Sequence, residues 1–217
     1  MSVQLVIFDC DGVLIDSELI ACSADAEALT AIGYPITAAE IVRRFAGIPS
    51  DAVYQTIEAE MGRPLPQDFD ENVKQTVYEK YRTELHPIDG AAEVLSSITL
   101  PKCIASSSAP AKLTLGLVET GLYKLVYPHI YSASLVRHGK PHPDLFQHAA
   151  LAMGADPADC LVIEDSVAGA TAARAAGMEC IGFTGGSHCE SGHGDLLRSA
   201  GADTIIDDLR DVLAHVS

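Results

Sequence analysis

The sequence predicts an α/β fold: a Rossmann-like, doubly wound parallel sheet core with an inserted all-helical cap domain. Residues 3–8 form a continuous apolar run, which is typical of a strand buried on both faces. From about residue 88 onward the chain alternates between helical and strand patterns, and repeated units of this kind build a parallel sheet covered by helices. Between these two regions, residues 18–86 contain no convincing strand.

The helical insertion is expected to contain four helices, at residues 18–33, 38–45, 51–61 and 69–85. The first helix is an alanine-rich segment that begins after Ser17, and Gly33 and Pro35 are expected to end it because both residues disfavour a continuing helix. We therefore predict a core domain made of residues 1–16 and 87–217, and a cap domain made of residues 17–86.

The second half of the chain is expected to supply the remaining strands and helices of the core. A last strand and helix are expected within residues 204–215. The other predicted strands are 102–105, 129–132, 160–163 and 179–183, and the predicted helices are 91–98, one that begins near 110, 143–153 and 167–176.

The charge and cysteine content of the chain limit the kinds of molecule that it is expected to bind. The 217 residues carry 14 basic and 30 acidic side chains, a formal net charge of −16, which argues against nucleic acid or an anionic membrane as a partner. The six cysteines form no CxxC pair, and the start of the chain resembles no secretory signal. We expect a cytoplasmic protein that acts on a small molecule, as a monomer or a weak dimer.

Polar side chains collect where the predicted strands end. In open α/β sheets the ligand binds beyond the carboxyl ends of the strands, so these side chains are expected to share one rim. Carboxylates, hydroxyls and a lysine together predict a phosphate and magnesium site. The residues are Asp9, Asp11, Ser106, Ser107, Ser108, Lys140, Glu164 and Asp165.

Each of these residue types suits that chemistry. Mg²⁺ prefers oxygen ligands and is commonly held by one or two carboxylates, which Asp9 and Asp165 can supply. Gly12 predicts a turn that brings Asp9 and Asp11 toward one site. Ser106 and the backbone N–H groups after it open a helix, where anions bind readily, and Lys140 adds a positive charge.

Four stretches in this order resemble the signatures of the haloacid dehalogenase-like hydrolase superfamily. They are residues 8–18, Ser106, residues 139–144 and residues 162–169, and the similarity extends over essentially the whole chain. Within the superfamily the chain resembles the branch of β-phosphoglucomutase and bacterial sugar-phosphate phosphatases, and residues 43–49 look most like those of 6-phosphogluconate phosphatases.

The resemblance implies Mg²⁺-dependent phosphotransfer through an aspartyl-phosphate on a small phosphate ester. Asp9 would be the nucleophile, and Asp11 would serve as general acid and then as general base. The phosphoryl oxygens would bind Ser106, Ser107 and Lys140, and the magnesium ligands would be Asp9, the backbone carbonyl of Asp11, Asp165 and, directly or indirectly, Glu164.

The cap decides between a phosphatase and a mutase. Where β-phosphoglucomutase has basic cap residues, this chain has Ala21, Ala46 and Ser50. Water is therefore the expected acceptor, and the expected substrate is a sugar phosphate such as 6-phosphogluconate. A phosphoglycolate or hexose-phosphate phosphatase, a mutase and a non-catalytic sugar-phosphate-binding protein remain alternatives. Candidate specificity residues in the cap are Arg43, Arg44 and Gly47, although a solvated helix face explains the arginines as well.

Three other patterns have simpler interpretations. The aspartates before Gly12 do not begin an EF-hand, because Leu14 and Ile20 occupy the positions that need glycine and glutamate. Cys10 is interpreted as a packing residue. A group of two histidines and a cysteine in a Gly/Ser-rich stretch lacks a fourth ligand at zinc spacing, so we interpret it as part of a flexible loop; it consists of His188, Cys189 and His193.

Overall fold

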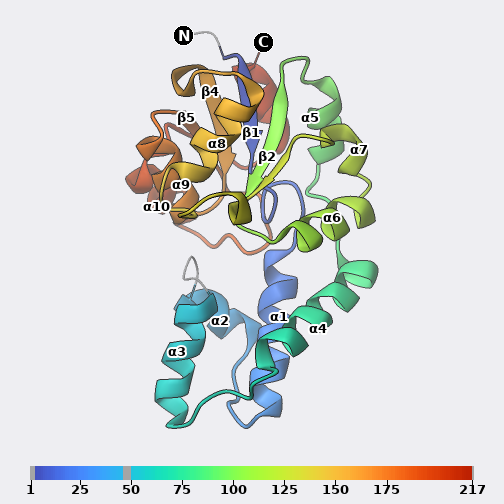
Figure 1. Cartoon of the computed structure of the whole chain (residues 1–217), viewed down its shortest axis with the longest axis vertical. Helices are drawn as coiled ribbons and strands as arrows, with labels where there is room; N and C mark the ends of the chain where they lie inside the picture. Colours follow the sequence, from blue (N-terminus) through green and yellow to red (C-terminus); the bar gives the residue numbers. More distant parts are fainter. Residues whose placement is uncertain (1–2, 46–49, 217) are drawn as a thin grey trace. The chain divides into compact units, whose positions relative to one another are not determined.

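The computed structural model describes residues 3–45 and 50–216, and the chain divides into two compact units (Figure 1). The α/β unit comprises Met1–Asp16 and Leu85–Ser217, and the helical unit comprises Ser17–Glu84. The chain therefore returns from the helical unit to the α/β unit at Leu85, two residues before the predicted boundary at residue 87. Backbone hydrogen bonds explain this position, because the Asp16 N–H donates to the His86 carbonyl over 3.0 Å.

The α/β unit contains one sheet of six parallel strands, which confirms the predicted fold class. The central strand β1 lies between β2 and β4, with Phe8 beside both Ile104 and Ile163. All strands therefore end at the same edge. The strands are β1 (Leu5–Phe8), β2 (Lys102–Ser106), β3 (Ile130–Ser132), β4 (Cys160–Glu164), β5 (Glu179–Phe183) and β6 (Thr204–Ile206), in the order β3-β2-β1-β4-β5-β6.

Both faces of this sheet are buried, as its unbroken apolar strands predict. On one face Ile7 and Val162 belong to a core with Phe146 of α8 and Ala173 of α9. On the other face Phe8 is completely buried. The helices are α5 (Ala91–Ser97), α6 (Pro110–Glu119), α7 (Tyr123–Val126), α8 (Asp144–Met153), α9 (Val167–Ala175) and α10 (His193–Ala200), with 3-10 turns η1 (Ala133–Leu135), η2 (Pro157–Asp159) and η3 (Leu209–His215).

The C-terminal region departs from the sequence-based prediction. Helix α10 begins at His193, directly after Gly192, whose φ of +88° ends the preceding loop. The interpretation that His193 lies in a loop was therefore wrong. The short helix α7 was not predicted, and the expected last helix is the 3-10 segment η3. These segments have only four to eight residues, which is too short for a hydrophobic periodicity to be detected.

The helical unit has its own apolar core. Helix α4 buries Phe69, Val73, Val77 and Tyr81, which are four residues apart and therefore form one stripe along the helix. Helix α1 packs against α4. The bounds of its helices are α1 (Glu18–Ala31), α2 (Ala38–Phe45), α3 (Ser50–Met61) and α4 (Phe69–Glu84).

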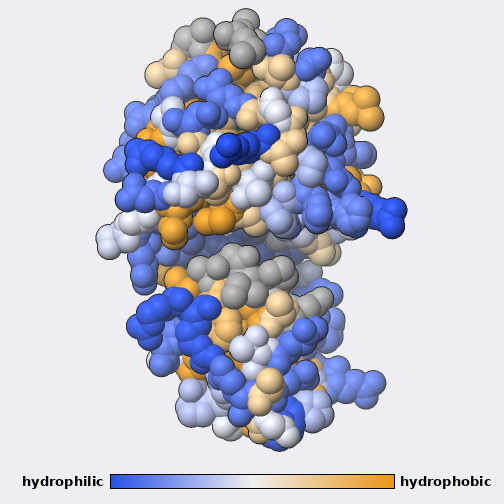
Figure 2. Space-filling model, turned by 90° about the vertical axis from the view of Figure 1, so that its left-hand side faces the viewer, coloured by the Kyte–Doolittle hydropathy of each residue, from blue (hydrophilic) through white to orange (hydrophobic). Residues whose placement is uncertain are grey.

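The surface matches the acidic, polar composition. Figure 2 shows a largely hydrophilic face with scattered apolar residues rather than one continuous apolar patch. None of the helices in the described part of the chain is both long and apolar enough to span a membrane. None of the six cysteines forms a disulfide, and Cys10 is buried, in line with a packing role.

Candidate active site

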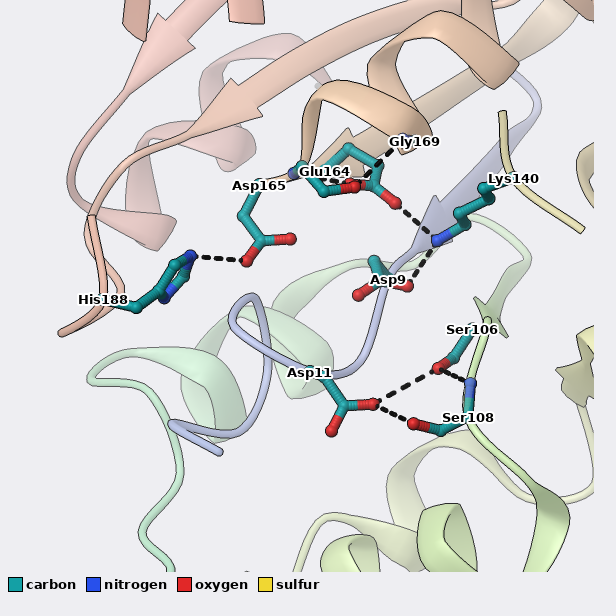
Figure 3. Close-up of polar contacts among 10 residues, drawn as sticks. Asp9, Asp11, Ser106, Ser108, Lys140, Glu164, Asp165, Gly169 and His188 are labelled. Atoms are coloured by element: carbon teal, nitrogen blue, oxygen red, sulfur yellow. Dashed lines mark hydrogen bonds and ion pairs between the residues drawn. The ribbon is translucent and has the colours of Figure 1, made fainter. Parts of the chain in front are cut away.

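The ends of the central strands bring together side chains from distant parts of the sequence (Figure 3). Asp9 directly follows β1, and its backbone N–H donates to the Ile163 carbonyl in β4 over 2.9 Å. This bond continues the sheet by one residue. It places the Asp9 side chain, which is only 9% exposed, beside the end of β4.

Lys140 links the ends of β1 and β4. Its Nζ lies 2.5 Å from Asp9 Oδ1 and also forms an ion pair with Glu164 Oε1. All three side chains are at least nine-tenths buried. An ammonium group in this position holds two carboxylates that would otherwise repel each other.

Glu164 is fixed by the start of α9. Its Oε2 accepts hydrogen bonds from the Ser166 N–H over 2.8 Å and from Ser166 Oγ over 2.9 Å. Ser166 in turn caps α9 by accepting from the Gly169 N–H over 3.0 Å. A Cβ on Gly169 would lie 1.9 Å from the Glu164 carboxylate, so the glycine makes room for this arrangement.

Asp165 is held from another direction. Its Oδ2 lies 3.0 Å from His188 Nε2, and its backbone carbonyl lies 2.5 Å from His193 Nε2. Gly12 makes the approach of Asp165 possible, because a Cβ there would lie 1.9 Å from Asp165 Oδ2. The φ of +79° at Gly12 also confirms the turn that the sequence predicts after Asp11.

Asp11 belongs to a second polar group, at the end of β2. Its Oδ2 accepts from Ser108 Oγ over 2.6 Å and from Ser106 Oγ over 3.4 Å. Its Oδ1 lies 2.9 Å from Lys112 Nζ in the first turn of α6. Ser107 is exposed, and it is Ser108 that contacts Asp11.

Burial and crowding shift the pKa values of the site carboxylates. Burial raises the pKa of Asp9 well above its usual range, Lys140 opposes this, and the charges of Glu164, Asp165 and Asp11 reinforce it. Burial also raises the pKa of Asp165, although the hydrogen bond with His188 lowers it in part. The buried group thus holds more negative charge than Lys140 can balance, which suits a divalent cation.

Lys140 keeps its charge in these surroundings. Burial alone would lower its pKa, but the carboxylates of Asp9 and Glu164 raise the pKa above its ordinary value. The ammonium is therefore available to an anionic ligand as a fixed positive charge. Lys140 is the positively charged residue that the sequence analysis placed at this site, and it lies beside Asp9 as expected.

The candidate specificity residues of the helical unit have partners within that unit or lie outside the described residues. Arg44 is exposed and pairs with Glu60 over 2.5 Å and with the Tyr34 hydroxyl over 2.8 Å. Arg43 is exposed. Gly47 and Ala46 lie outside the described residues. A role of Arg43, Arg44 or Gly47 in specificity stays a prediction.

Sequence reasoning missed three contacts with the predicted site residues. Ser108 and Lys112 bind Asp11, and His188 binds Asp165. A signal for Lys112 was present, because it lies in the first turn of the helix after a strand end. Nothing in the sequence indicates that the loop after β5 returns to the end of β4.

Comparison with known proteins agrees with this geometry. The family model of the haloacid dehalogenase-like hydrolases matches residues 3–177. The chain is 40% identical to a haloacid dehalogenase-like protein from Agrobacterium tumefaciens, with a TM-score of 0.89 and coverage of 99% of this chain and 98% of that one. The chain therefore belongs to the haloacid dehalogenase-like hydrolase family.

Two further relatives refine the comparison. The chain is 32% identical to the 6-phosphogluconate phosphatase of Escherichia coli (strain K12), over 86% of this chain and 85% of that protein. It is 33% identical to a hydrolase of the same family from Deinococcus radiodurans, with a TM-score of 0.81 and coverage of 99% and 95%; that structure holds phosphate and sodium. Within its family, the chain is an enzyme of the phosphatase class.

Proposed function

We propose that this enzyme is a Mg²⁺-dependent phosphatase that hydrolyses a sugar phosphate, such as 6-phosphogluconate, through an aspartyl-phosphate at Asp9. In this proposal the α/β unit is catalytic and the helical unit is a cap that contributes to substrate specificity. The observation that carries it is the buried group of Asp9, Glu164 and Asp165 around one lysine.

The residues of this group fit magnesium. Carboxylate oxygens are the ligands that Mg²⁺ prefers. Burial raises the pKa values of Asp9 and Asp165, and the charge of Glu164 adds to this, so a bound cation would stabilise their charged forms. Asp9, Asp165 and the backbone carbonyl of Asp11 would hold the ion, and Glu164 would contribute through Lys140 and the Ser166 contacts. Bound magnesium would offset the repulsion between the Asp9 carboxylate and an anionic phosphoryl group.

The first half-reaction transfers the phosphoryl group to the enzyme. The Asp9 carboxylate forms a bond to phosphorus while the bond from phosphorus to the ester oxygen breaks. Asp11 supplies the proton that the leaving alkoxide needs. Lys140, Ser106 and the backbone N–H groups that follow Ser106 bind the phosphoryl oxygens, and Ser107 remains a candidate for the same role.

The second half-reaction returns the enzyme to its starting state. Asp11, now a carboxylate, takes a proton from water while the water oxygen attacks phosphorus, and the acyl-phosphate bond breaks to release phosphate and free Asp9. The contacts of Asp11 with Ser108 and Lys112 hold its carboxyl group in place for both steps.

The substrate class is supported by the relatives. The Escherichia coli protein is a 6-phosphogluconate phosphatase, and the Deinococcus radiodurans structure holds a phosphate. Transfer to water rather than to a second sugar position is supported by the uncharged side chains of Ala21 in α1 and Ser50 in α3, which offer no cation for a second phosphate.

Phosphate release tests the proposal. We expect turnover of p-nitrophenyl phosphate and of a sugar-phosphate panel that includes 6-phosphogluconate, and we expect chelation of Mg²⁺ to abolish it. Asp9→Asn should lose at least about 10³-fold in kcat, because the variant lacks the nucleophile. Asp211→Asn, which changes an exposed carboxylate of η3 in the same way, should keep wild-type kcat.

Three outcomes would contradict the proposal. Full turnover by Asp9→Asn would overturn the nucleophile assignment. Binding of sugar phosphates without turnover on the whole panel would favour a binding protein. Conversion of β-glucose 1-phosphate to the 6-phosphate in the presence of a bisphosphate activator, without phosphate release, would favour a mutase.

A further inference from the structure

A second group of potential metal ligands lies beside the proposed magnesium site. It consists of His188 and Cys189, in the loop after β5, and His193, the first residue of α10. One ligand atom from each residue lies within 4.8 Å of the others. None of the three side chains has a role in the proposed phosphatase steps.

The His188 ring is confined by the backbone around it. A Cβ on Gly12 would lie 2.9 Å from the ring Cε1, and a Cβ on Gly186 would lie 2.7 Å from it, so the ring occupies space that two glycines leave open. Its Nδ1 is buried and has no hydrogen-bond partner among the residues that the structure describes. The other ring nitrogen, Nε2, faces the group.

The ligand atoms converge on a common space. His188 Nε2 lies 3.4 Å from Cys189 Sγ and 3.0 Å from Asp165 Oδ2. Around a tetrahedral zinc ion, bonds of about 2.0–2.3 Å place neighbouring ligand atoms about 3.3–3.6 Å apart. The His188–Cys189 separation matches this spacing. The three ligand atoms lie at most 4.8 Å apart, so the side chains would need to move by only about 1 Å to reach the spacing around a zinc ion.

The ligand types select a cation that differs from magnesium. Two imidazoles and a thiolate are ligands for Zn²⁺ and related borderline or soft cations, whereas Mg²⁺ prefers oxygen. The fold brings a candidate fourth ligand beside these three, because the Asp165 carboxylate lies 3.0 Å from His188 Nε2 at the end of β4 (Figure 3). The structure therefore offers three clustered donors and a neighbouring carboxylate that can complete a four-coordinate site by a shift of its side chain.

We propose that His188, Cys189, His193 and Asp165 form a Zn²⁺ site, and that zinc bound there inhibits the enzyme by withdrawing Asp165 from magnesium. Binding of zinc stands on the geometry alone. The inhibitory consequence rests on the proposed function, because it requires Asp165 to be a magnesium ligand.

Direct binding to the full chain tests the site without substrate or magnesium. With the metal-stripped, reduced protein, a chromophoric chelator should report one tightly bound Zn²⁺ per chain. Co²⁺ in its place should show a thiolate-to-cobalt charge-transfer band. Cys189→Ser should abolish that band and weaken zinc binding by about 100-fold or more, and His193→Gln should weaken it by at least about tenfold.

A matched control is available in the helical unit. Cys22 is also a half-buried cysteine outside any disulfide, so Cys22→Ser removes a thiol that is not a ligand of the proposed site and should leave zinc affinity and the cobalt band unchanged. Zinc affinity that is the same in wild type, Cys189→Ser and His193→Gln would overturn the site. So would a failure of wild type to bind zinc.

Kinetics then test the consequence. In wild type, zinc that fills the site should raise the Mg²⁺ concentration for half-maximal turnover by at least about tenfold relative to wild type without zinc. In Cys189→Ser the same zinc concentration should raise it much less, relative to that variant without zinc. Equal inhibition of both proteins would place the inhibitory zinc in the magnesium site and overturn the mechanism. If zinc binds as described but no Mg²⁺-dependent turnover exists, the proposed function fails and the zinc site stands.

Discussion

The two units differ in one use of charge: among the described residues, the α/β unit holds a buried network of ion pairs in addition to exposed ones, whereas the ion pairs of the helical unit lie at its surface. In the α/β unit Lys140, Asp9 and Glu164 are almost completely buried and hold one another. In the helical unit the pair Arg44 and Glu60 is exposed, with 36% and 43% of the side chains accessible. Burying charge is costly, so a fold retains such a group where chemistry needs it, whereas exposed pairs contribute little to stability. The contrast supports the proposal that the α/β unit carries the catalytic residues.

Replacing Lys140 should give the largest effect. Lys140→Met leaves Asp9 and Glu164 facing each other in a buried space, and we expect the free energy of unfolding without divalent cation to fall by about 3–5 kcal/mol. Urea denaturation at neutral pH measures this. Lys74→Met removes an exposed lysine that pairs with Glu71 over 3.4 Å, and should change stability by less than about 0.5 kcal/mol. Similar losses in the two variants would remove the contrast between the units.

Adding one methyl group to a glycine of each unit should give intermediate effects. Gly169→Ala pushes a Cβ into the Glu164 carboxylate, and overpacking of this kind costs about 1–3 kcal/mol. Gly62→Ala meets no atom within 4 Å and is strained only by its φ of +65°, which costs about 1 kcal/mol. Thermal unfolding of both variants compares them. A larger loss for Gly62→Ala would show that Glu164 moves aside freely.

Removing the exposed pair of the helical unit should have the smallest effect. Arg44→Ala loses the contacts with Glu60 and Tyr34, and the unfolding free energy should fall by less than about 1 kcal/mol. Arg43→Ala, an exposed neighbour on the same helix, is the control. If the KM for a sugar phosphate rises in Arg44→Ala and not in Arg43→Ala, while both variants keep wild-type stability, then Arg44 takes part in substrate binding.

Most of the sheet could be predicted from sequence because its strands are buried on both faces. Residues 160–163, for example, form an apolar run that is followed by two acids, Glu164 and Asp165, so both the strand and its polar end were recognisable. The same reasoning placed Lys140 beside Asp9 across 131 positions of sequence.

The remaining contacts depend on tertiary structure that leaves no local pattern. His188 reaches Asp165 because the loop after β5 brings its ring beside Gly12, where this glycine and Gly186 of the same loop leave room for it, and neither glycine signals this by its spacing. Ser108, and not Ser107, contacts Asp11. The alternation of side chains along a strand predicts their direction only as far as the last residue of β2, so it could not show which of the two serines faces Asp11.

The position of β1 at the centre of the sheet has a consequence for synthesis of the protein. β1 is made first, but one of its two neighbours, β4, begins only at Cys160. In a nascent chain that ends before this residue, one edge of β1 has no neighbouring strand. Asp9, at the end of β1, then lacks Glu164, with which it shares Lys140 in the folded protein. Such long-range pairing slows folding. Until the ribosome has made residues 160–164, that open edge of β1 exposes unpaired backbone groups and apolar side chains to which a chaperone can bind.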